Sequence, residues 1–136
     1  LGALNAVKMY LPNLKLSEKA SVVFFSSVAV QLGMPFHASV GINKGAIEGL
    51  TRSLAAELSP EIRVNAIALS LTETKMTQRM TNTEEKKQGI AQRHPLGTIG
   101  STEDVSNMLD FLLTEKSAWM TGQILHLDGG MSAVKK

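Results

Sequence analysis

Two short apolar runs on either side of a long amphipathic stretch constrain the fold of this chain more than any other feature. Residues 21–26 read Ser-Val-Val-Phe-Phe-Ser, and residues 62–67 read Ile-Arg-Val-Asn-Ala-Ile. The first run shows no polar alternation, which is typical of a parallel strand covered on both faces. Residues 37–58 carry apolar side chains at spacings of 7, 3, 4 and 4, which predicts one apolar stripe on a helix. Strand, helix and strand in this order predict a βαβ unit.

The rest of the chain predicts one more strand and two more helices. Residues 1–14 have apolar side chains at roughly helical spacing, and Pro12 predicts that this helix ends nearby. Residues 101–104 read Ser-Thr-Glu-Asp, which resembles a capping box with aspartate in place of glutamate and predicts a helix through Leu113. Residues 123–127 predict a third strand. We therefore expect an α/β fold with about three strands and flanking helices.

Composition excludes several kinds of site. The 136 residues include no cysteine, which excludes disulfide bonds, thiolate zinc sites and a cysteine nucleophile. His94 and His126 are scattered along the chain, and no carboxylate-rich cluster lies near them in sequence. We therefore expect no metal site.

Charge and hydropathy argue against nucleic-acid and membrane partners. The net charge is +2, and no stripe of Lys and Arg is interleaved with aromatic residues. The longest apolar stretch, residues 20–36, is interrupted by serine, glutamine, glycine and proline, so it does not predict a membrane span. No signal-peptide pattern opens the sequence. We expect no nucleic acid and no membrane as partners, and a cytoplasmic location.

A row of glycines runs along the predicted long helix. Gly41, Gly45 and Gly49 follow one another at four-residue spacing, so they share one helix face. Each glycine inside a helix costs roughly 0.5–1 kcal/mol relative to alanine. The row therefore indicates that another backbone packs very close, such as a helix of a second subunit in a homo-oligomer. The alternative is that these are tolerated surface glycines.

The segment from His37 to Lys44 reads His-Ala-Ser-Val-Gly-Ile-Asn-Lys and follows a strand that ends in Ser26-Ser27. This layout resembles the catalytic segment of the short-chain dehydrogenase/reductase family. There, a serine, a tyrosine and a lysine four residues beyond the tyrosine carry proton transfer. Further landmarks of that family occur in the family's order at residues 45–58, 63–67, 95–97, 100, 103–104, 121–122 and 128–130.

The resemblance implies a Rossmann-like, doubly wound parallel sheet, of which residues 1–136 form the C-terminal half. It also implies NAD or NADP as cofactor and a small-molecule carbonyl or alcohol as substrate. In this family the dinucleotide sits on a glycine-rich turn after the first strand. No such turn occurs in this sequence. The dinucleotide-binding N-terminal half is therefore expected upstream of Leu1, and residues 1–136 alone are expected to be inactive.

Three positions of the catalytic segment carry over from the family. Ser27 would orient the substrate carbonyl, although a strand-end serine can also bond the local backbone. Lys44 would bond the nicotinamide ribose and lower the pKa of a neighbouring tyrosine. The tyrosine position, thirteen residues after Ser27, is occupied by Val40, which has no proton to transfer. General acid–base assistance is worth about 10²–10⁴ in rate, so this substitution predicts a degenerate active site.

His37 is the candidate substitute proton donor, because an imidazole titrates near neutral pH. It lies three residues before Val40, about one helical turn away. The alternative is a capping or loop histidine without a catalytic role.

Residues 69–100 are polar, with few large apolar side chains, and we expect them to be mobile. Residues 69–74 take the place of the family's Pro-Gly-x-x-x-Thr loop, with Leu69 and Ser70 in place of proline and glycine. The resemblance implies that Thr72 and Thr74 contact the cofactor. Both threonines are equally compatible with helix N-caps. Residues 75–93 would form the substrate lid.

Two functions therefore compete. The first is an NAD(P)-dependent oxidoreductase of this family with a degenerate active site, favoured by the retention of Ser27 and Lys44. The second is a non-catalytic relative that binds a dinucleotide or a partner, or assembles through the glycine-striped helix, favoured by Val40. A third possibility is a packing-only assembly, in which another chain covers the unpaired sheet edge.

Overall fold

The computed structural model describes residues 2–135 and contains a three-stranded parallel sheet. The strands are β1 (Ala20–Ser27), β2 (Ile62–Leu69) and β3 (Ile124–Leu127), in the spatial order β1-β2-β3. β1 pairs with β2 from Ala20↔Ile62 to Ser27↔Leu69, and β2 pairs with β3 from Ala66↔Ile124 to Leu69↔Leu127. The expected α/β fold with parallel strands is confirmed.

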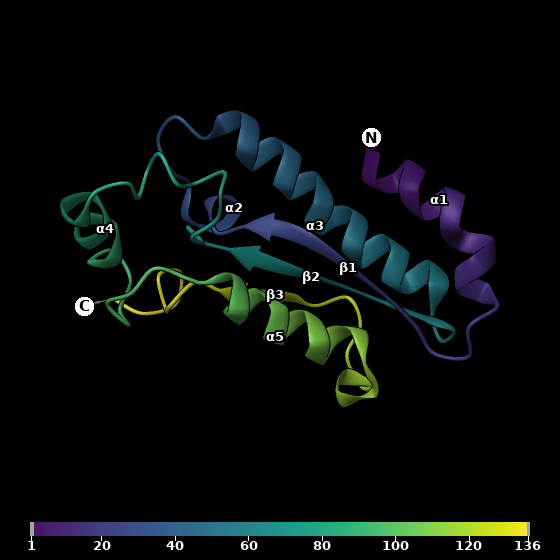
Figure 1. Cartoon of the computed structure of the whole chain (residues 1–136). Coiled ribbons are helices and arrows are strands. Elements are labelled where there is room, and N and C mark those ends of the chain that lie inside the picture. The colour runs from purple at the N-terminus through teal and green to yellow at the C-terminus, as the bar shows by residue number, and fades with distance from the viewer. Residues whose placement is uncertain (1, 136) are drawn as a thin grey trace.

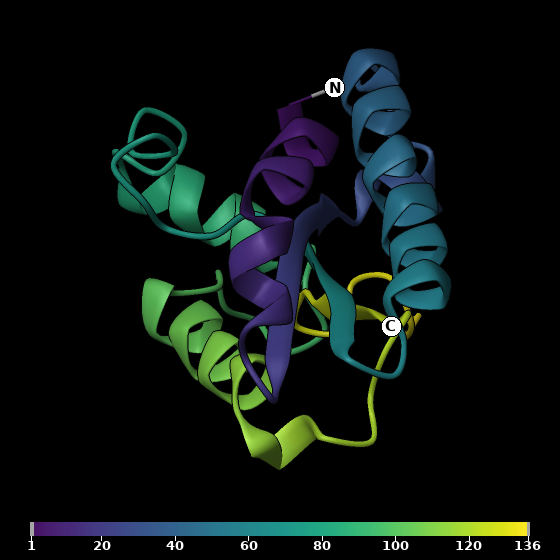
Figure 2. The same cartoon turned by 90° about the vertical axis from the view of Figure 1, so that its right-hand side faces the viewer.

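Helices lie on both faces of the sheet, so the described residues form three layers (Figures 1 and 2). The long helix α3 (Ala38–Leu58) covers one face, and α5 (Thr102–Leu113) covers the other. The first helix, α1 (Gly2–Lys15), joins the α3 side. There, Val7 of α1 and Leu54 of α3 belong to one buried cluster with residues of β1 and β2.

The central strand β2 is the most deeply buried element. Val64, Ala66, Ile67 and Ala68 have no exposed surface, which fits a strand flanked on both sides and covered on both faces. Asn65 is equally buried, and its side chain donates to the carbonyl of Met120 at 3.0 Å and accepts from the amide of Gln123 at 3.0 Å. This asparagine joins β2 to the segment that leads into β3 and leaves no polar atom of its side chain unpaired.

Two helix ends bear on the sequence predictions. The α1 helix continues three residues beyond Pro12 to Lys15, so the expectation that the proline ends the helix nearby holds only approximately; residue 1 lies outside the described residues. The capping box at the start of α5 is confirmed. The Ser101 hydroxyl accepts from the Asp104 amide at 3.1 Å, and an Asp104 carboxylate oxygen accepts from the Ser101 amide at 2.8 Å.

The structure adds three short helices that the sequence reading did not delimit. They are α2 (Ala29–Leu32), α4 (Glu84–Ala91) and the 3₁₀ helix η1 (Glu115–Ser117). The α4 helix lies within the polar segment 69–100, and its N-cap Thr83 accepts from the Lys86 amide at 3.3 Å. Part of that segment is thus regular structure.

The carboxyl ends of the strands define one edge of the sheet. β1 and β2 point toward this edge, where α2, α4 and the chain's C-terminal segment also gather (Figure 1). Ligands of open parallel α/β sheets bind outside this edge. Among residues 2–135, no helix has the length and apolar character that crossing a membrane requires.

Candidate active site

Ser27 is the last residue of β1 and stands at the carboxyl edge of the sheet. It pairs with Leu69, the last residue of β2, and the Val28 amide donates to the Leu69 carbonyl at 3.1 Å. The Ser27 hydroxyl oxygen accepts from the Ala29 amide at 3.2 Å, which is the local backbone bond expected of a strand-end serine. That bond uses an oxygen lone pair, so the hydroxyl hydrogen can still be donated to a carbonyl oxygen.

Lys44 reaches the same strand end from α3. Its ammonium group donates to the Phe25 carbonyl at 2.9 Å, two residues before Ser27. An ammonium group has three donors, so this bond leaves two for hydroxyl groups of a ligand. The structure thus brings Ser27 and Lys44, which are seventeen residues apart in sequence, to one end of β1.

Val40 lies one helical turn before Lys44 on α3, and about a third of its surface (36%) is exposed. It therefore does not belong to the buried part of the apolar stripe predicted for this helix. A side chain at this position lies on the same helix as Lys44 and is open to solvent.

His37 immediately precedes α3, but its side chain does not cap the helix. Its Nδ1 lies 2.8 Å from the Pro35 carbonyl, and because a carbonyl oxygen only accepts, Nδ1 carries the hydrogen. The neutral ring then presents Nε2 as an acceptor. In the described part of the chain, no hydrogen bond joins His37 to Ser27 or Lys44.

A part-buried hydrogen bond between Ser26 and Glu48, which the sequence analysis missed, joins the residue before Ser27 to α3. Ser26 is 4% exposed, and its hydroxyl donates to Glu48 Oε1 at 2.7 Å. Glu48 lies one turn after Lys44 on α3, and its other carboxylate oxygen is 3.6 Å from the Arg52 guanidinium. The signal for this contact was the spacing of the charged residues Lys44, Glu48 and Arg52 at four-residue intervals along the helix.

The two threonines proposed for cofactor contact lie in the loop after β2. Thr72 pairs with Gly100 in an isolated bridge, and its hydroxyl donates to the Ser70 carbonyl at 3.4 Å. Thr74 forms a local turn with Thr77, whose hydroxyl lies 2.8 Å from the Thr74 amide and 3.1 Å from the Thr74 hydroxyl. Thr74 therefore makes the local contacts expected of a cap. The Thr72 hydroxyl makes only the long bond to Ser70, so it is the more available of the two for a ligand.

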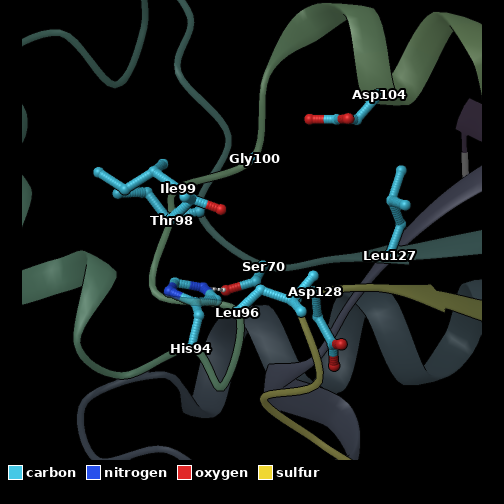
Figure 3. A pocket seen from close by; sticks show the side chains of 11 residues that line it. Ser70, His94, Leu96, Thr98, Ile99, Gly100, Asp104, Leu127 and Asp128 are labelled. Atoms are coloured by element: carbon cyan, nitrogen blue, oxygen red, sulfur yellow. Dashed lines mark hydrogen bonds between the residues drawn. The ribbon is translucent and has the colours of Figure 1, made fainter.

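Ser70 and His94 form a second contact that the sequence analysis did not anticipate. Ser70 Oγ lies 2.7 Å from His94 Nε2, and His94 Nδ1 lies 3.0 Å from the Ile90 carbonyl. Both side chains line a cavity of about 140 Å³, with Asp104 on its opposite side (Figure 3). The separation of Ser70 and His94 by twenty-four residues gives no sequence signal for this pair.

Asp128 anchors the turn that follows β3. Burial raises the pKa of its carboxyl, but hydrogen bonds from Ser132 and from the Gly130 amide outweigh burial and leave the pKa below its ordinary value. The carboxylate accepts from the Gly130 amide at 2.9 Å and from the Ser132 amide at 2.9 Å. Both oxygens of the carboxylate thus accept hydrogen bonds from backbone amides. Residues 2–135 contain no group of three or more histidines and carboxylates placed to hold a metal ion.

Comparison with known proteins decides the family. A family model described as enoyl-(acyl carrier protein) reductase matches residues 1–132. The chain belongs to the short-chain dehydrogenase/reductase family. Relatives include a tropinone reductase homolog of Arabidopsis thaliana, 37% identical over 122 residues, and a 3-oxoacyl-[acyl-carrier-protein] reductase of Thermotoga maritima, 34% identical over 131 residues. These matches cover 89% and 96% of this chain, respectively.

Comparison with solved structures confirms the Rossmann-like fold. The structure of ElxO with NADP bound superposes with a TM-score of 0.85 at 29% identity, over 94% of this chain. The match spans 52% of ElxO, and the two relatives above are spanned to 46% and 52%. The chain thus spans about half the length of the short-chain dehydrogenases/reductases it matches.

Proposed function

We propose that this chain is the C-terminal half of an NAD(P)-dependent oxidoreductase that acts on a small carbonyl or hydroxyl substrate. One observation carries the proposal: Ser27 ends β1, and the ammonium group of Lys44 donates to the carbonyl of Phe25, two residues earlier on the same strand. A neutral donor for a carbonyl oxygen and a cation with free donors thus belong to the same end of the strand.

The residues present fit the nicotinamide end of the cofactor. Lys44 is held at the strand end through a single bond to Phe25, so its remaining donors suit the hydroxyls of a ribose. Thr72, in the loop after β2, can turn its hydroxyl from the weak 3.4 Å bond to Ser70 toward an amide or phosphate. Thr74 is the second proposed contact. The bound nicotinamide supplies hydride transfer.

The roles of this chain's residues follow from their chemistry. Ser27 donates its hydroxyl hydrogen to the substrate oxygen, orients the carbonyl and polarises it. The positive charge of Lys44 stabilises negative charge that develops on that oxygen. Val40 adds neither a donor nor an acceptor. The final proton must therefore come from another group or from water, which makes the proposed active site a degenerate one.

His37 is our proposed substitute for the missing donor. Its bond to Pro35 fixes Nδ1–H and leaves Nε2 available to bind and release a proton. Replacement of His37 by alanine in the protein at its natural length should abolish turnover without changing the affinity for the cofactor. An unchanged rate would remove His37 from the mechanism.

Titration with NADH and NADPH, followed by a carbonyl-substrate screen, tests the proposed function. Cofactor binding with measurable oxidation of NADH or NADPH would support the oxidoreductase. The preference between the two cofactors has to be measured, since the residues that choose between them are expected outside this chain. A protein that binds neither dinucleotide would refute the proposal.

A non-catalytic role in assembly is the second candidate, and the open face of α3 favours it. A β-carbon added at Gly41 or Gly49 would meet no atom within 4 Å, and at Gly45 only the Val30 side chain at 3.9 Å. Ile42 on the same helix is 74% exposed. No backbone of residues 2–135 fills this face, so a second copy of the chain is our proposed occupant, giving a homo-oligomer.

Replacement of Gly49 by glutamate would place a charge on that face. We expect the variant to elute at a lower mass in size-exclusion chromatography with light scattering, whereas Arg79→Glu, in an exposed loop, should leave the mass unchanged. An unchanged mass for the Gly49 variant would refute assembly through α3. The cytoplasmic location stays a prediction, which fractionation of cells that contain the tagged protein would check.

A further inference from the structure

The loop that follows β2 is held mainly by contacts with distant segments. The Ser70 hydroxyl meets His94 at 2.7 Å, and Thr72 bridges to Gly100, whose amide donates to the Leu71 carbonyl at 3.3 Å. The Glu73 amide donates to the Gly100 carbonyl at 2.8 Å. The course of residues 70–73 therefore depends on how residues 94–100 are placed.

His94 is itself fixed from three directions. The ring is 4% exposed, and Nδ1 donates to the Ile90 carbonyl at 3.0 Å. With the hydrogen on Nδ1, the neutral ring can only accept at Nε2, so the Ser70 hydroxyl donates to it. Ser70 Oγ also lies 3.3 Å from the Met131 sulfur, so the hydroxyl is enclosed on a second side.

The third side of His94 is closed by the turn after β3. A β-carbon at Gly129 would lie 3.3 Å from the His94 β-carbon, and Gly129 has φ +60°, where glycine is favoured. The Leu96 amide donates to the Gly129 carbonyl at 3.1 Å. One buried histidine thus joins residues 70–73, residues 94–100 and the turn at Gly129. Figure 3 shows the His94 ring facing the Ser70 hydroxyl.

We propose that Ser70 and His94 are positioning residues that hold loop 70–73 so that Thr72 faces the nicotinamide dinucleotide. This inference rests on the proposed function. Proline and glycine, which set the course of this loop in the family pattern, are replaced here by Leu69 and Ser70. The side-chain bond between Ser70 and His94 takes over that task, because it ties the half-buried Ser70 to a buried histidine that is itself held by the Ile90 carbonyl.

The pair has a competing interpretation in which Ser70 itself transfers a proton. His94 accepts the Ser70 hydrogen and could act as a base toward it. The cavity that both residues line does not include Ser27, Val40 or Lys44 among its walls. Positioning is therefore the role that the geometry supports, and proton transfer is an outcome that the test must distinguish.

The experiment compares Ser70→Ala with Ser70→Thr, which retains a hydroxyl, in the protein at its natural length. Ser106→Ala, exposed on α5, is the matched control. Loss of one hydrogen bond predicts a rise of up to about tenfold in Kd for NADH or NADPH in Ser70→Ala. Turnover at saturating cofactor should be unchanged, and Ser70→Thr and Ser106→Ala should bind like the unaltered protein.

Hydrogen exchange supplies a readout that does not depend on the cofactor. The amides of residues 71–73 should exchange faster in Ser70→Ala and also in His94→Leu, whereas His94→Gln, which keeps an acceptor near Nε2, should restore part of the protection. Unaltered protein that binds no dinucleotide would refute the proposed function. Unaltered protein that binds, with Ser70→Ala binding equally well, would overturn this inference alone. A fall in turnover at unchanged Kd would overturn it in favour of proton transfer.

Discussion

The Ser26 hydroxyl donates to the Glu48 carboxylate at 2.7 Å, one residue before the strand end at Ser27. One turn earlier on the same helix, Lys44 donates to the Phe25 carbonyl. Lys44 and Glu48, four residues apart on α3, thus form hydrogen bonds with the consecutive β1 residues Phe25 and Ser26. The site residues are placed by this pair of contacts between helix and strand rather than by the loops around them.

Removal of the Glu48 carboxylate should destabilise the fold. In Glu48→Ala, the buried Ser26 hydroxyl loses its partner, which costs about 1–3 kcal/mol. We expect urea unfolding to show this loss in the free energy of unfolding, while Glu57→Ala, exposed near the end of the same helix, changes it by less than about 0.5 kcal/mol. Equal stabilities of the two variants would contradict the role of Glu48.

Restoring a phenol at position 40 tests whether the site lacks only its proton donor. Val40 is partly exposed and one turn from Lys44, so Val40→Tyr has room for the ring. We expect kcat to rise, by up to about 10²–10⁴-fold if proton transfer limits the reaction. Ile42→Tyr, at an exposed position of the same helix, is the control and should leave kcat unchanged. If cofactor binds but Val40→Tyr gives no gain, the site has diverged in more than this residue.

Asn65 should be among the least replaceable polar residues. It is fully buried, and its two bonds to Met120 and Gln123 join β2 to the approach of β3. Asn65→Ala removes both of these part-buried bonds, and a backbone group left unpaired away from water costs about 1–3 kcal/mol. Thermal unfolding should show a much lower Tm for this variant than for Asn107→Ala, which is exposed on α5. A Tm close to that of the unaltered chain would disprove the role assigned to Asn65.

The lowered pKa of Asp128 predicts that the free energy of unfolding falls in acid. Its folded-state pKa lies below the ordinary value of 3.8, because bonds from Ser132 and Gly130 outweigh the effect of burial. A depressed carboxyl pKa contributes stability that is fully present above the unfolded-state pKa and is lost as pH falls through the folded-state pKa. The free energy of unfolding should therefore decline below about pH 4, and Asp128→Asn should flatten this decline. Asp110→Asn, exposed on α5, is the control; identical profiles would contradict the prediction.

The elements that depend on local pattern were predicted correctly from sequence. The apolar run Val22–Phe25 within β1, the long amphipathic helix and the capping box at Ser101 all carry short-range signals of burial or hydrogen bonding. Ser27 and Lys44 were placed together through family resemblance. Their catalytic roles stay predictions; in the structure Ser27 ends β1 and Lys44 of α3 donates to the Phe25 carbonyl.

Contacts between distant segments could not be predicted in the same way. The Ser70–His94 pair forms because the fold brings residues 70, 94 and 129 to one edge of the sheet. No sequence pattern around any of these residues indicates that the others lie nearby. Pro12 is a local signal of the first kind. It predicted a helix end nearby, and α1 ends three residues later at Lys15.

The fully buried strand β2 also determines the order in which the described part of the molecule can open. Ala66–Leu69 pair with strands on both sides, so their amides should exchange with solvent only when the whole domain unfolds. β3 has four residues and lies at an edge of the described sheet, so it can detach in a smaller, more frequent opening. Each such opening would carry Gly129 away from His94. The lifetime of the arrangement around loop 70–73 should therefore follow the fraying of β3 and not the global stability of the fold.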